Sequence, residues 1–253
     1  MVYSVFLWRK GFRTHDRVNY LLLLAAFGLH TSAMVQRGFS LNRCPVNNLF
    51  EATIFIAWAL ALACLIVGLM PRLRHLAAFA SPVLFVIGVF ALMPGLDPPR
   101  GARPEFSGWL PSFHATMILL AYGAFGLASV AAIMFLTQQH NLKFNKLRAV
   151  LSLLPSIQRL ELVTNRLLWV GFCLLTIGLL AGGRLPRPEG APFLKDAKVI
   201  WSIVLWLLYL GLLVGRWRFS FSGRRFACGV IGIFAFVLLT FWGTNLLSGL
   251  HHP

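Results

Sequence analysis

The chain has 253 residues, of which 58% are hydrophobic and only 12% are charged. Soluble domains carry about 25% charged residues, so this composition points to lipid rather than water as the main solvent. The formal net charge is +16, but the basic residues occur in short clusters between long apolar runs, which is the membrane pattern and excludes nucleic acid as an expected partner.

Seven apolar runs are each long enough, at about 20 residues, to cross a bilayer as a helix. Because the bilayer core offers no water to backbone groups, these runs must be helices. We therefore predict an all-α, polytopic helix bundle that forms a single membrane domain over residues 1–253. The expected transmembrane helices cover about 18–36, 49–70, 76–95, 113–136, 167–183, 199–215 and 226–248.

The connections between these runs differ in charge. Fifteen of the 23 Lys and Arg residues fall in one alternating set of connections, and eight fall in the other. By the positive-inside rule, we expect the N-terminus in the cytoplasm and the C-terminus outside, in a multi-pass protein of the inner (plasma) membrane. In the inner loop 138–165, the stretch LKFNKLRAVLSLL has one apolar stripe. It predicts an amphipathic surface helix that binds anionic membrane lipid or, alternatively, a partner protein.

Three of the expected helices carry histidines toward the outer face. His30 lies past the middle of the first helix, His114 opens the fourth, and His251 follows the last. Neutral imidazole is a good ligand for haem iron or a transition metal, and a six-coordinate b-type haem takes two imidazoles from facing helices. The alternative is that each histidine is an ordinary polar residue at a helix end. Zinc is less favoured, because no acidic residue recurs near these positions.

Other residues on the outer side each allow two interpretations. Arg37 and Arg43 could pair with haem propionates or could extend toward the membrane surface in the ordinary way. Trp109 and Trp201 could stack on a porphyrin or belong to the aromatic belt. Glu51, in the first turn of the second helix, could complement the helix dipole or could handle a proton or a propionate. The sequence contains no Ser-His-Asp arrangement, P-loop or paired catalytic carboxylates, so we predict a protein without turnover chemistry.

Five segments between about residues 40 and 250 resemble motifs of one protein family and occur in the same order as in that family. The first of these segments contains the pattern P-x-x-N-x-x-E. The segments are CPVNNLFEATIFIAW (44–58), FHATMILLAYGAFGLAS (113–129), LLWVGFCLLTIGLLAGG (167–183), KDAKVIWSIVLWLLYL (195–210) and FWGTNLLSGLHHP (241–253). Together they resemble the CcsA/HemX-like cytochrome c assembly family.

The resemblance implies a membrane protein of cytochrome c biogenesis that handles or transports haem at the outer face. It implies that His114 and His251 are the axial ligands of a haem b. It also implies haem itself and another membrane or cytochrome c assembly protein as partners. The candidate haem-binding set is completed by His30, Trp109, Trp201 and Arg43.

The sequence departs from the family in the outer loop 184–198. Haem-exporting members carry a tryptophan-rich run there, whereas GGRLPRPEGAPFLKD (182–196) has no tryptophan. A transmembrane histidine of the family is replaced by Val214. These departures leave two alternatives to haem delivery, namely a HemX-like regulator or scaffold of haem metabolism, and an accessory subunit of a larger membrane complex that lacks haem.

Overall fold

The computed structural model of the protein describes residues 16–41, 44–46, 48–93, 96–97, 108–144, 155–185, 196–219 and 221–247. Within these ranges the structure consists of seven α-helices and one short 3-10 helix, η1, without a strand. Each predicted run coincides with one α-helix, so the all-helical prediction is confirmed. The elements are α2 (Asp16–Leu41), α3 (Leu49–Gly68), η1 (Pro71–Leu73), α4 (Leu76–Ala91), α5 (Trp109–Phe144), α7 (Ile157–Gly182), α8 (Ala197–Arg218) and α9 (Gly223–Leu247).

Six of the seven helices are long and apolar enough to cross a membrane. The exception is α4, whose 16 residues span about 24 Å at 1.5 Å per residue, less than the roughly 30 Å of a hydrocarbon core. The periphery of the bundle exposes large apolar side chains, including Leu29 (75%), Phe39 (77%) and Leu239 (83%), which water would not favour. The protein is therefore a polytopic helical membrane protein.

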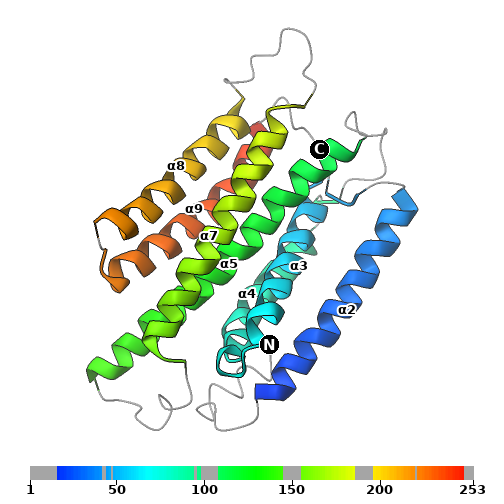
Figure 1. Ribbon diagram of the computed structural model, residues 1–253. Coiled ribbons are helices and arrows are strands. Elements are labelled where there is room, and N and C mark those ends of the chain that lie inside the picture. The colour runs from blue at the N-terminus through cyan, green and yellow to red at the C-terminus, as the bar shows by residue number, and fades with distance from the viewer. Residues whose placement is uncertain are drawn as a thin grey trace.

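The helices run alternately up and down, with α5 at the centre of the bundle (Figure 1). Helices α3, α4, α7 and α9 pack against α5, while α8 packs on α7 and α9. Helix α2 packs on α3 and α4 at the edge of the bundle. We call the end where α3, α5 and α8 begin the outer end, following the predicted orientation, and the opposite end the inner end. The start of α2 and the end of α9 lie at opposite ends of the bundle.

Side-chain caps begin three of the helices, and each satisfies a backbone amide that the helix itself leaves unpaired. Asn48 accepts a hydrogen bond from the amide of Glu51 at the start of α3, at 2.7 Å. Ser156 caps α7. Asp196 caps α8 by accepting from the amide of Lys198, at 2.9 Å, and from that of Val199, at 3.2 Å. These three caps mark where α3, α7 and α8 start.

Two helices, α5 and α7, extend well past the predicted spans at their inner ends. Helix α5 has 36 residues and continues through the polar segment 137–144, beyond the predicted limit at 136. Helix α7 begins at Ile157, ten residues before the predicted 167. Residues 138–144 and 157–165 of the predicted inner loop are thus helical. The amphipathic stretch 142–154 lies mostly outside the described residues, as does nearly all of the outer loop 184–198, so these two predictions stay predictions.

Candidate functional site

His114 lies in the second turn of α5, at the outer end, with its imidazole against α7. Its Nδ1 atom is 2.7 Å from the carbonyl oxygen of Gly178. A carbonyl oxygen can only accept a hydrogen bond, so Nδ1 must carry the hydrogen and donate it. In the neutral imidazole this leaves Nε2 with its lone pair, and the described residues give Nε2 no hydrogen-bond partner. The ring is thus held in the orientation and tautomer that metal-ligating histidines commonly have.

Two glycines of α7 make room for this imidazole. A Cβ atom built on Gly182 would lie 2.5 Å from Cε1 of His114 and 2.6 Å from Nδ1, closer than real carbon contacts allow. A Cβ atom on Gly178 would lie 2.7 Å from Cγ1 of Ile118, one turn further along α5. The segment LLTIGLLAGG therefore brings α7 close enough to α5 for the ring to reach a backbone carbonyl. The sequence analysis assigned no role to these glycines.

Lys198 and Asp196 stand at the start of α8, at the outer end of the bundle. Asp196 is buried and its carboxylate accepts the two backbone hydrogen bonds that cap the helix. Lys198, two residues later, lies within electrostatic range of both Asp196 and His114. A cationic side chain therefore lies near the imidazole at the outer end of the bundle.

Trp201 lies inside the bundle. Only 6% of it is exposed, and its Nε1 donates to Oγ1 of Thr240 on α9, at 2.6 Å. Its ring meets Tyr122 of α5 edge to face, with centroids 6.1 Å apart. Trp206, further along α8, donates in the same way to Thr176 on α7, at 3.0 Å. Trp201 thus joins α8 to α5 and α9, and the aromatic-belt interpretation is wrong for this residue.

Trp109, unlike Trp201, lies at the surface of the bundle. It is the first residue of α5 and is 77% exposed. Its ring centroid lies 6.3 Å from that of Phe113, one turn later on the same helix. An exposed indole at a helix end matches an aromatic belt and equally an exposed aromatic surface next to His114, so both interpretations of Trp109 remain.

His30 is placed apart from His114. It is half-buried on α2, and α3 and α4 lie between α2 and α5 (Figure 1). The next residue, Thr31, accepts a hydrogen bond from Nε1 of Trp58 on α3, at 2.9 Å, so this turn of α2 faces α3. His251 and Arg43 lie outside the described residues. The structure therefore does not bring His30 against His114, and the position of His251 stays a prediction.

A second polar cluster at the outer end escaped the sequence analysis. Arg37 of α2 donates from Nε to Oε1 of Glu51, at 3.0 Å, and from Nη1 to Oδ2 of Asp97, at 3.0 Å. Asn48 donates to Asp97 as well, at 2.9 Å. Glu51 is fully buried, so the guanidinium supplies the positive charge that a buried carboxylate needs.

This cluster gives the pattern P-x-x-N-x-x-E a physical role. Its Asn48 caps α3, and its Glu51 has the expected place in the first turn of α3. In addition, Glu51 ties the end of α2 to α3 through Arg37. Arg37 is therefore engaged by two carboxylates, which neither the propionate nor the membrane-surface interpretation anticipated. The sequence signal that could have found the pair is a carboxylate in an otherwise uncharged apolar run, which needs a cationic partner.

The chain is similar to known proteins over most of its length. The model of the family described as "Cytochrome C assembly protein" matches residues 46–251. Two similar cyanobacterial proteins are named cytochrome c biogenesis protein CcsA. The one from Prochlorococcus marinus (strain MIT 9303) is 26% identical over 96% of this chain and 86% of its own length. The one from Synechococcus sp. (strain RCC307) is 29% identical over 93% and 84%.

A third protein of the same name comes from Pyropia yezoensis. It is 26% identical over 99% of this chain and 91% of its own length. The similarity thus covers the whole bundle, including both helices that meet at His114. With a family model that matches most of its length, the chain belongs to the cytochrome c assembly protein family.

Proposed function

We propose that the protein binds haem b at the outer end of the bundle as part of cytochrome c assembly, with His114 as one axial ligand and His251 as the other. Family membership supports the role in cytochrome c assembly. The observation that carries the haem proposal is the hydrogen bond from Nδ1 of His114 to Gly178, because it leaves Nε2 as the atom that can donate electrons to iron.

The residues present fit haem better than a bare metal ion. Among the described residues, no group of three or more His, Cys, Asp and Glu side chains could hold a metal ion. A structural or catalytic zinc site needs three or four such ligands, whereas haem iron takes only one or two from the protein. Bound haem supplies an iron with two axial coordination positions, and the chain's own groups supply its orientation.

Each neighbouring residue has a distinct part in this proposal. Lys198 places a positive charge near the imidazole, where a propionate can be paired. Trp109 offers an exposed indole on the ligand helix itself, five residues before His114. Trp201 holds the start of α8 against α5 and α9, so it positions the site from inside the bundle. Arg43 and His30 stay in the candidate set as a propionate partner and as a residue that affects haem occupancy.

In this proposal the protein binds haem and presents it at the outer face without converting it chemically. The outer end faces outward from the inner (plasma) membrane, where another cytochrome c assembly protein receives the cargo. The absence of tryptophan from 182–196 means that the porphyrin must be held by side chains other than those of a tryptophan-rich loop.

The absorption spectrum of the detergent-purified, full-length protein tests this proposal. The reduced wild-type protein should show a low-spin b-type spectrum. His114→Gly should give five-coordinate, high-spin iron that returns to low spin on addition of imidazole, because the free base fills the vacated axial position. His251→Gly should behave in the same way, and His30→Gly should lower haem occupancy but keep the low-spin spectrum.

His140→Gly is the matched control. His140 lies on the same helix as His114, 26 residues later, which is about 39 Å along the axis. Its loss should leave the spectrum unchanged. A low-spin spectrum in His114→Gly without added imidazole would refute the ligand assignment. Wild-type protein that takes up no haem would favour the accessory-subunit alternative.

A further inference from the structure

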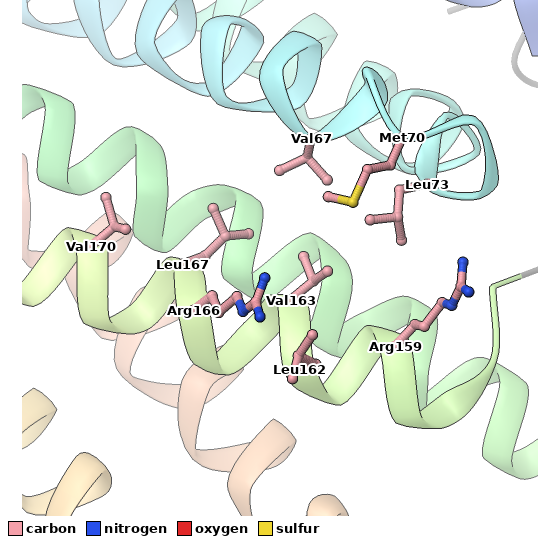
Figure 2. Close-up of a pocket in the computed structure, with 9 residues that line it drawn as sticks. All are labelled: Val67, Met70, Leu73, Arg159, Leu162, Val163, Arg166, Leu167 and Val170. Carbon is pink, nitrogen blue, oxygen red and sulfur yellow. The ribbon is translucent and has the colours of Figure 1, made fainter.

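A cavity of about 310 Å³ lies between the α3–η1 corner and the first half of α7 (Figure 2), at the inner end of the bundle, where α3 ends and α7 begins. One wall is the α3–η1 corner, and the other is the first half of α7. Both α3 and α7 pack on α5, which leaves the space between them open on the side away from α5. Seven of the nine lining residues are apolar, and the other two are Arg159 and Arg166.

The cavity combines apolar walls with two cationic side chains. Leu167 and Val170 lie toward one end of the α7 wall, Val67 and Met70 lie on the opposite wall, and Arg159 lies at the other end beside Leu73 (Figure 2). Arg166 lies beside Leu167. The two arginines are seven residues apart on α7, so they share one helix face about 10 Å apart along the axis. An occupant of this cavity therefore meets two guanidinium groups along the α7 side and apolar side chains over the rest of the wall.

Neither arginine is neutralised by the described part of the chain. Both side chains are exposed, and neither takes part in an ion pair among the described residues. The acidic residue nearest to them in sequence, Glu161, pairs instead with Arg216. The cavity thus presents two uncompensated guanidinium groups, which are suited to a phosphate through paired N–H donors.

From these observations we infer that the cavity between the α3–η1 corner and α7 binds an anionic phospholipid, with its phosphate at Arg159 and Arg166 and one acyl chain along Val67, Leu167 and Val170. The volume is at the lower limit of ligand pockets, so it takes a segment of one chain while the rest of the lipid stays in the bilayer. The inner end is the predicted cytoplasmic side, where anionic lipids concentrate. This site goes beyond the proposed haem function and lies at the other end of the bundle.

Native mass spectrometry of the full chain tests this inference, with phosphatidylglycerol and phosphatidylcholine of identical acyl chains. One basic residue near an anionic lipid contributes about a fivefold preference, so two predict about a thirtyfold preference for phosphatidylglycerol. Arg159→Gln with Arg166→Gln should abolish the preference. Arg218→Gln with Arg224→Gln is the matched control, because these two arginines are also exposed at the inner end but do not line the cavity. The control variant should keep the full preference.

Two further measurements test the acyl-chain part. Val67→Phe puts a larger side chain into the cavity from the α3 wall. It should weaken phosphatidylglycerol binding although both arginines remain. Free glycerol phosphate at millimolar concentration should not displace the lipid, because it lacks the chain. Equal loss of preference in both arginine double variants would overturn the inference in favour of general surface charge. Displacement by glycerol phosphate or by haem would assign the cavity to that ligand instead.

Discussion

The contact between Gly182 and the imidazole of His114 can be tested by a single methyl group. In Gly182→Ala, the new Cβ atom would lie 2.5 Å from Cε1 of His114, whereas ordinary van der Waals contact begins at 3.4 Å. The ring must therefore move by about 1 Å. A shift of that size lengthens the 2.7 Å hydrogen bond to Gly178 beyond its useful range, and frees the ring from its fixed orientation.

Three effects determine the size of the change in stability. Overpacking at a tight contact costs about 1–3 kcal/mol, and loss of the hydrogen bond costs about 1 kcal/mol. Alanine also favours a helix over glycine by up to about 1 kcal/mol. Gly183→Ala is the control for that gain, because its Cβ atom would meet only two carbonyl oxygens at 3.6 Å. We expect Gly182→Ala to be less stable than Gly183→Ala by about 2–4 kcal/mol, a difference of several degrees in Tm.

The assay combines thermal unfolding in detergent with the haem spectrum. Gly182→Ala should lower haem occupancy or convert iron to high spin, and Gly183→Ala should do neither. In the Gly182→Ala, His114→Ala double variant, the destabilisation from the methyl group should largely disappear, because the ring that it strikes is gone. If Gly182→Ala matched Gly183→Ala in both Tm and spectrum, the close contact between the His114 imidazole and Gly182 would be refuted.

Three further predictions concern other parts of the bundle. Arg37→Ala leaves the buried carboxylate of Glu51 without its cation and should lower the free energy of unfolding by about 3 kcal/mol. Asp97→Ala should lower it by at most about 1 kcal/mol, because the Asp97 side chain is 41% exposed. The Tm values of the two variants test this difference. Trp201→Phe removes one hydrogen bond between α8 and α9 and should cost about 1 kcal/mol, again seen in Tm. A topology reporter after Pro253 should register outside and one within 145–154 inside, and reversed signals would contradict the orientation.

Hydropathy predicted the number and order of the helices correctly, but not their ends. The method detects the residues that lie in hydrocarbon, since only these must be apolar. Helix α5 continues through Gln138, Gln139 and His140, because its backbone hydrogen bonds remain favourable where the helix leaves the lipid. The capped starts of α3 and α8 and the uncapped start of α4 were predicted within two residues. The start of α7, although capped by Ser156, was missed by ten residues because its first turns contain polar residues.

The sequence by itself determined that the chain is a helical membrane protein, and it singled out His114 through a motif that begins a helix. Both conclusions rest on local properties, namely apolar length and the residue type at a helix end. Only the tertiary structure decided what His114 contacts, because Gly178 is 64 residues away and belongs to a different helix. The same is true of Arg37 and Asp97, 60 residues apart, and of Trp201 and Thr240, 39 apart. Within lipid, every helix face is apolar enough to be tolerated, so hydropathy does not tell which faces meet. Small residues and paired polar groups decide that, and their partners are chosen by the packing of the whole bundle.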